Sequence, residues 1–147
     1  MKMKNELEIV IVEDNPNDAE LMLRSLKKNR LANNIVILED GEQALDFIFC
    51  RGKYTDRDLS ESPKVMFLDL KLPKVGGLEV LKQMKSNEHT RKIPVIVVTS
   101  SKEDPDIAAA YNLGANSYVV KPIDFDSFVE KINQIGLYWL AINEKPI

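Results

Sequence analysis

The chain has 147 residues, which suits a single domain with a hydrophobic core of its own. Its net charge of −3 argues against a nucleic-acid-binding surface, because a phosphate backbone requires clustered lysine and arginine. One cysteine, one histidine and a short first apolar run argue against internal disulfides, zinc chemistry and a membrane span, so we expect a cytoplasmic protein.

Short apolar runs alternate with helix-like stretches along the whole chain. We predict strands at residues 7–12, 35–38, 65–68, 93–98 and 117–120. Residues 52–63 are polar and without period, which is typical of a surface loop. Gln43 follows Asp40 at the spacing of a capping box. Helices are predicted to begin at cap, proline or glycine signals near Asn15, Asp40, Gly77, Asp104 and Asp124.

Five strands that alternate with five helices indicate an α/β fold with a doubly wound, five-stranded parallel sheet. We expect the strand order 2-1-3-4-5, which is the flavodoxin-like arrangement. This order places the first and third strands side by side. The residues that follow them, Glu13, Asp14 and Asp69, then meet at one edge of the sheet.

Polar residues follow four of the predicted strands at this edge. Glu13 and Asp14 follow the first strand and Asp69 follows the third. Thr99 and Lys121 follow the fourth and fifth strands. A cluster of three acids favours the binding of a hard cation, and an ammonium favours the binding of an anion. A phosphoryl group held with Mg²⁺ supplies both. Each signal alone also has an ordinary explanation, such as a helix cap or a solvated lysine.

We predict that Asp69 is the nucleophile, because a carboxylate can attack a phosphoryl group and form an acyl phosphate. The backbone carbonyl of Lys71 is a further predicted metal ligand. Lys121 is suited to pairing with phosphate oxygens, and its bond to Pro122 is a candidate cis peptide that would aim the ammonium inward. Thr99 offers a hydroxyl donor for a phosphoryl oxygen.

With these motifs in this order, the chain resembles the receiver domains of two-component response regulators, from about residue 7 to residue 135. The resemblance implies that Asp69 accepts a phosphoryl group from a histidine on a partner kinase. It also implies that Asp14, Asp69 and the Lys71 carbonyl bind Mg²⁺, with Glu13 acting directly or through water. The sign of any effect of the Lys71 side chain on phosphate lifetime does not follow from the sequence.

The resemblance also assigns roles to the residues at the ends of the last two strands. Lys121 and Thr99 would hold the phosphoryl oxygens, and Tyr118, at the family's aromatic switch position, would turn inward on activation. The chain would act as a switch for protein partners, and the only reactions it would catalyse are its own phosphorylation and dephosphorylation. We expect residues 1–147 to be a single receiver domain with a core from about 7 to 142 and no output domain.

The long loop at residues 52–63, the motif at residues 69–73 and the aromatic C-terminal stretch resemble one branch of the family. That branch is the small single-domain regulators paired with phytochrome-type histidine kinases. Residues 137–142 are apolar, and both core packing and a homodimer or partner surface explain them. The partners expected are therefore a histidine kinase, a downstream protein and a second copy of the chain.

Three alternatives remain open from the sequence. A phosphatase of the haloacid-dehalogenase type also uses an aspartate nucleophile with Mg²⁺, but it needs a second aspartate where this chain has Lys71. A flavodoxin-like cofactor binder needs a hydroxyl- and glycine-rich loop where this chain has residues 13–16, Glu-Asp-Asn-Pro. A receiver-like binding module that is never phosphorylated is the third.

Overall fold

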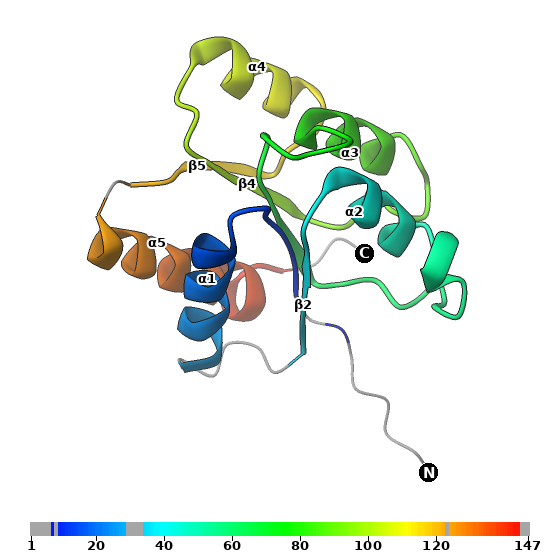
Figure 1. Cartoon of the computed structure of the whole chain (residues 1–147), viewed down its shortest axis with the longest axis horizontal. Helices are drawn as coiled ribbons and strands as arrows, with labels where there is room; N and C mark the ends of the chain where they lie inside the picture. The colour runs from blue at the N-terminus through cyan, green and yellow to red at the C-terminus, as the bar shows by residue number, and fades with distance from the viewer. Residues whose placement is uncertain (1–6, 8, 29–33, 123, 145–147) are drawn as a thin grey trace.

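The computed structural model describes residues 7, 9–28, 34–122 and 124–144. Its centre is a parallel sheet of five strands in the order β2-β1-β3-β4-β5 (Figure 1). The strands are β1 (Ile9–Val12), β2 (Ile35–Leu38), β3 (Val65–Leu68), β4 (Val95–Thr99) and β5 (Ser117–Val120). The predicted fold class and strand order are confirmed.

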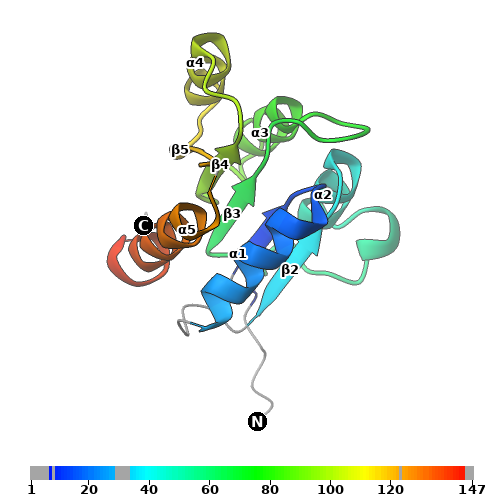
Figure 2. The ribbon, with the colours of Figure 1, turned by 60° about the vertical axis from the view of Figure 1, so that its left-hand side comes forward.

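Helices cover both faces of the sheet. They are α1 (Pro16–Lys28), α2 (Gly41–Ile48), α3 (Gly77–Lys85), α4 (Asp104–Asn112) and α5 (Phe125–Leu137). Helices α1 and α5 contact each other on one face, and α2, α3 and α4 follow one another on the other face (Figures 1 and 2). None of the helices in the described part of the chain is both long and apolar enough to cross a membrane.

The strands divide the hydrophobic core into two clusters, because alternate side chains of a strand point to opposite faces. In β1, Val10 and Val12 belong to the cluster under α2 and α3, whereas Ile9 and Ile11 belong to the cluster under α1 and α5. All four side chains are at most 1% exposed. Burial on both faces explains why the fully buried strands β1, β3 and β4 read as continuous apolar runs in the sequence.

The strand register brings the polar residues to one edge. Val12 pairs with Leu38 and Leu68, so Glu13 and Asp69 follow neighbouring strand ends. Two backbone bonds continue the ladder into the site: Glu13 N–H donates to the Leu38 carbonyl at 2.9 Å and Asp69 N–H donates to the Val12 carbonyl at 3.1 Å. The carboxyl ends of the strands therefore hold the acids in fixed positions.

The predicted helix starts are confirmed at three caps. The Asn15 side chain accepts from the backbone N–H groups of residues 17 and 18, and the side chains of Asp40 and Asp124 accept from residues 43 and 127. The capping box differs by one residue from the prediction, because the Gln43 side chain accepts from the N–H of Glu39 and not of Asp40. The N–H of Glu39 is the donor within its reach.

Three predicted elements differ from the structure. The first strand begins at Ile9, and Leu7 lies outside it. The fourth strand is Val95–Thr99 and not residues 93–98, so Thr99 is the last residue of the strand itself. The loop at residues 52–63 contains a short 3₁₀ helix, η1 (Gly52–Tyr54). Residue 8, in the first predicted strand, lies outside the described residues.

Two glycines allow the loop that follows Asp69 to lie against the helices. A Cβ atom on Gly77 would come within 2.2 Å of the Asp69 carbonyl oxygen, and one on Gly41 within 1.8 Å of the Val75 carbonyl oxygen. Gly77 N–H also donates to the Leu70 carbonyl at 2.9 Å. These two positions need glycine for close backbone approach, and the approach fixes the loop beside Asp69.

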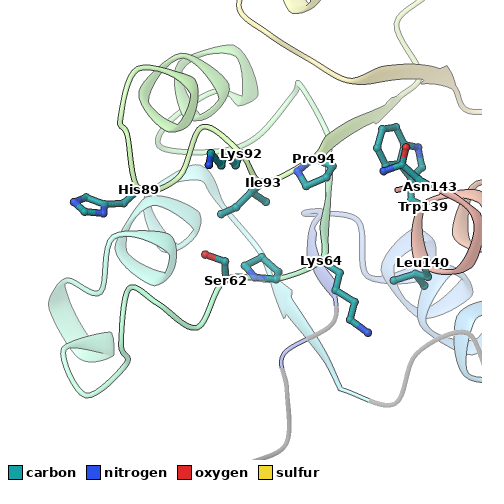
Figure 3. Close-up of a pocket in the computed structure, with 10 residues that line it drawn as sticks. Ser62, Lys64, His89, Lys92, Ile93, Pro94, Trp139, Leu140 and Asn143 are labelled. Carbon is teal, nitrogen blue, oxygen red and sulfur yellow. The ribbon is translucent and has the colours of Figure 1, made fainter. Parts of the chain in front are cut away.

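The C-terminal stretch is partly packed against the core and partly exposed. Helix α5 continues into a π-helical turn, η2 (Tyr138–Ile142), in which Trp139 and Leu140 pack against the core. Leu137, Tyr138 and Ile142 are 47% to 59% exposed. Trp139 and Leu140 also line a cavity of about 360 Å³ with residues that precede β3 and β4 (Figure 3). That cavity lies at the amino ends of the strands, opposite the acidic edge.

Candidate functional site

Three carboxylates form a cluster at the carboxyl ends of β1 and β3. Oxygen atoms of Glu13, Asp14 and Asp69 all lie within 4.8 Å of one another. Glu13 and Asp69 are only 3% and 6% exposed, whereas Asp14 is exposed. The structure therefore brings together the three acids that the sequence placed at this edge.

The Lys121 ammonium lies among the acids, and its side chain is 11% exposed. It donates to Glu13 Oε1 at 2.5 Å and to Asp69 Oδ2 at 2.9 Å. A third carboxylate, Asp18 Oδ2 in the first turn of α1, accepts from it at 2.9 Å. Burial alone would lower the pKa of Lys121, but the bonds to Glu13, Asp18 and Asp69 outweigh it and raise the pKa.

The sequence hypothesis of a cis bond before Pro122 is wrong for this structure. No cis peptide occurs among the residues described, which include Lys121 and Pro122. The ammonium reaches the acids through the length of its side chain, and Lys121 N–H continues the sheet ladder by donating to the Thr99 carbonyl at 2.8 Å.

The two buried acids differ in proton affinity. Burial and then the nearby charge of Asp69 raise the pKa of Glu13 from 4.5 to about 7, although Lys121 acts against this rise. Burial also acts to raise the pKa of Asp69, but hydrogen bonds and charge from Lys121, with a bond from Glu13, lower it below its ordinary value. Asp69 is therefore held as the carboxylate, the form in which it is a nucleophile.

The donor set at this edge fits a hard divalent cation. Carboxylate oxygens within 4.8 Å of one another need only a small inward shift to become ligands of one octahedral ion at about 2.1 Å. The Lys71 backbone N–H donates to Asp69 Oδ1 at 3.2 Å, which orients the carboxylate and places residue 71 beside the cluster. The metal-binding role of the Lys71 carbonyl stays a prediction.

Thr99 and Tyr118 are joined through Ser101. Thr99 is fully buried at the end of β4, and its hydroxyl oxygen accepts from the Ser101 N–H at 3.4 Å. The Tyr118 hydroxyl, from β5, donates to the Ser101 carbonyl at 2.8 Å. Ser101 also donates through its own hydroxyl to Asp106 Oδ2 in α4, at 2.5 Å. Ser101 thus links Thr99 to both β5 and α4.

The sequence analysis missed two residues of this site. Neither Asp18 nor Ser101 was singled out as a site residue. The signal for Asp18 is its place in the first turn of the helix that leaves the acidic edge. The signal for Ser101 is weak, because only the path of the chain between β4 and α4 brings it beneath Tyr118.

The edge of this sheet carries clustered acids, a lysine that contacts two of them, and Thr99 linked to Tyr118 through Ser101. This combination defines a phosphoacceptor domain. Residues 9–133 match the response regulator receiver domain family, and the chain belongs to that family. It is a phosphoacceptor response regulator, a class of protein that accepts a phosphoryl group from a histidine kinase. Neither the phosphatase alternative nor a receiver-like module without phosphorylation is favoured by these matches.

Two relatives match nearly the whole of this chain. The chain is 38% identical over 138 residues to the probable methanogenesis regulatory protein FilR2 of Methanothrix harundinacea, covering 94% of this chain and 86% of that protein. It is 35% identical over 138 residues to response regulator Rcp1 of Synechocystis, covering 94% and 92%.

Solved structures of similar proteins agree with this family membership. The Mn²⁺-bound form of Rcp1 superposes with a TM-score of 0.89 at 33% identity, covering 96% of this chain and 99% of that one. The phosphorylated cyanobacterial phytochrome response regulator RcpA superposes with a TM-score of 0.90 at 30% identity, covering 97% and 100%.

Proposed function

We propose that Asp69 is the residue that accepts the phosphoryl group. The observation that carries this assignment is the position of its carboxylate, which contacts Lys121 at 2.9 Å and lies within 4.8 Å of Glu13 and Asp14. No other acid in the described part of the chain is placed both in the acidic cluster and directly after β3. The lowered pKa keeps Asp69 ionised for attack.

The transfer proceeds by attack of an Asp69 oxygen on the phosphorus of a phosphohistidine. An oxygen–phosphorus bond forms as the nitrogen–phosphorus bond breaks, and the imidazole keeps that electron pair and takes a proton from solvent. The protein would contribute position and charge, with Lys121 and the Thr99 hydroxyl donating to the phosphoryl oxygens. The product is an acyl phosphate on Asp69.

We propose Mg²⁺ as the physiological cation of the acidic cluster. Glu13, Asp14 and Asp69 would hold it with the Lys71 carbonyl, and the oxygen-only donor set is the kind that Mg²⁺ prefers. When bound, the ion neutralises charge on the phosphoryl oxygens during transfer. The Mn²⁺-bound form of Rcp1 supports the binding of a divalent cation.

We propose that Thr99, Ser101 and Tyr118 form the switch. A phosphoryl group on Asp69 adds charge and acceptor oxygens, which draw the Thr99 hydroxyl toward them. Ser101 is bonded to Thr99 and is held by Tyr118, so the relay repositions β5 and the start of α4. The surface of α4, β5 and α5 is then the output face.

The partners we propose are a phytochrome-type histidine kinase and a downstream protein. The supporting observation is the similarity to RcpA over nearly the whole of both chains. Residues 1–147 would act as one receiver domain in the cytoplasm, where ATP-dependent kinases supply phosphohistidine. The five strands of the described residues lie in one sheet, which supports a single domain.

We also propose that the exposed C-terminal surface supports a homodimer. Tyr138 and Ile142 are 47% and 59% exposed on η2, and exposed aromatic clusters mark interfaces. In sedimentation analysis the wild type is expected to be a dimer, and Tyr138→Glu is expected to be a monomer. The matched control is Leu59→Glu, at an exposed residue on the η1 loop, and it should remain dimeric. A monomeric wild type would contradict the dimer.

The decisive test of function is phosphorylation followed by intact mass. With acetyl phosphate and Mg²⁺, the wild type is expected to gain one phosphoryl group that is labile to acid and base. Asp69→Asn should gain none, because the amide lacks a nucleophilic oxygen. Asp14→Asn should be phosphorylated more slowly while keeping the acceptor. A phosphoryl group on Asp69→Asn would show that the acceptor is a different residue.

A further inference from the structure

The Lys121 ammonium has three N–H bonds, and the structure assigns a carboxylate to each of them. Glu13, Asp18 and Asp69 accept at 2.5, 2.9 and 2.9 Å. If Lys121 also holds the phosphoryl group on Asp69, as in the proposed function on which this inference rests, one of these bonds must be given up. The two carboxylates that remain then share the ammonium with the incoming group.

Asp18 differs from the other two carboxylates in its position. Glu13 and Asp69 belong to the acidic cluster and would have the proposed divalent cation as a second partner, whereas Asp18 lies outside that cluster on α1. The Asp18 side chain is 29% exposed, compared with 2% for Glu13 and 8% for Asp69. With the cluster loaded, Asp18 is thus the carboxylate that depends on Lys121 alone.

Asp18 also faces the solvent side of the site. Together with Lys121 it lines a cavity of about 370 Å³ between α1 and α5, whose rim includes Asp124 and Phe125. A phosphoryl group on Asp69 carries a charge of about −2, and it would meet the carboxylate of Asp18 across a single ammonium. Two anions on one cation repel each other, and the repulsion is only partly screened by solvent.

We propose that Asp18 competes with the phosphoryl group for the Lys121 ammonium and thereby slows the phosphorylation of Asp69. Asp18 acts through Lys121 and is therefore a positioning residue. It keeps the ammonium at the site in the unphosphorylated protein and opposes the anion that arrives. An asparagine at this position keeps the acceptor oxygen for Lys121 and removes the opposing charge.

The test compares Asp18→Asn and Asp18→Ala with wild type in the rate of phosphorylation by acetyl phosphate at saturating Mg²⁺. Asp18→Asn is expected to react about threefold to tenfold faster than wild type at about 50 mM salt, because the substitution removes one partly screened charge. The gain should shrink at about 1 M salt. Asp18→Ala loses the anchor as well as the charge, so its rate should lie below that of Asp18→Asn.

The matched control is Asp124→Asn. Asp124 lines the same cavity, but its carboxylate accepts from the Ser127 N–H at 2.9 Å as the cap of α5, and asparagine can also cap. This variant is expected to stay within about twofold of wild type, because its charge acts on the cavity and not on Lys121. An equal gain in Asp124→Asn would show a general charge effect and would overturn the proposal.

An Asp18→Asn protein that reacts no faster than wild type would also overturn the role of Asp18. A merely structural role would lower the rate of both Asp18 variants, which is the opposite of the expected order. The role of Asp18 and the proposed function can be refuted separately. A phosphorylated wild type with an unaccelerated Asp18→Asn refutes this inference alone, whereas a wild type that is never phosphorylated refutes the proposed function with it.

Discussion

Replacing Lys121 with methionine is expected to lower the free energy of unfolding of the metal-free protein by about 3 kcal/mol at pH 8. The ammonium is the shared partner of Glu13 and Asp69, whose side chains are 2% and 8% exposed. Its removal leaves two carboxylates buried side by side without a cation. The expected loss of stability lies at the lower end of the range for a broken buried ion pair, because Glu13 can take up a proton.

The pH dependence of this loss has a definite sign. In the wild type, the raised pKa of Glu13 means that stabilisation from its bound proton is present below pH 4.5 and is lost as pH rises through about 7. The lowered pKa of Asp69 acts oppositely, since its stabilisation is lost as pH falls below its ordinary value of 3.8. Without Lys121 the pKa of both acids rises, so the variant should lose stability more steeply between about pH 5 and about pH 8.

Urea unfolding of the metal-free proteins at about pH 5 and about pH 8 measures this effect. Lys121→Arg is the matched control, because it keeps the positive charge and should lose much less stability. Added Mg²⁺ should restore part of the stability of Lys121→Met, since a cation in the acidic cluster relieves the same repulsion. Equal stability of Lys121→Met and wild type at both pH values would contradict the shared ion pair.

Gly77→Ala is expected to destabilise the protein by about 3 kcal/mol and to impair phosphorylation. The new Cβ would lie 2.2 Å from the Asp69 carbonyl oxygen and 2.6 Å from the Leu70 Cα. Both atoms belong to the backbone, so no side-chain rotation relieves the contact. The loop after Asp69 must move away from α3, and the acceptor carboxylate moves with it.

The neighbouring glycine provides the control for this substitution. At Gly76 the nearest atom to a new Cβ is the Leu70 carbonyl oxygen at 3.9 Å, and the backbone is extended with φ −70° and ψ 158°. Gly76→Ala should therefore be close to wild type in melting temperature and in phosphorylation rate. A Gly77→Ala protein that matches Gly76→Ala in both measurements would show that the loop tolerates displacement.

The sheet edge was predictable because strand ends are marked in the sequence. An apolar run that ends at an acid, a threonine or a lysine shows which side chain lies at the carboxyl end of that strand. The parallel strand order then gathers Glu13, Asp69, Thr99 and Lys121 at one edge of the sheet. The five strands were found for the same reason. A sequence pattern predicts structure best where a polar residue directly follows an apolar run and so marks the end of a strand.

The contacts missed by the sequence are those that join two elements through flexible side chains. Asp18, in the first turn of α1, meets Lys121, which directly follows β5, and the two residues are 103 positions apart. The partner of the Gln43 amide, Glu39 and not Asp40, also depends on local geometry that the spacing does not encode. The course of residues 100–103, which places Ser101 under Tyr118, is likewise set by tertiary packing.

The long span of the Lys121 bonds has a consequence during protein synthesis. Its three carboxylate partners precede it by 108, 103 and 52 residues, so every acid of the site is made before the cation that neutralises it. A nascent chain on the ribosome therefore carries unneutralised acids until β5 and Lys121 emerge. Contacts of such sequence separation form late in folding, so the Lys121 ion pairs require β5 to have been made and to have joined the sheet.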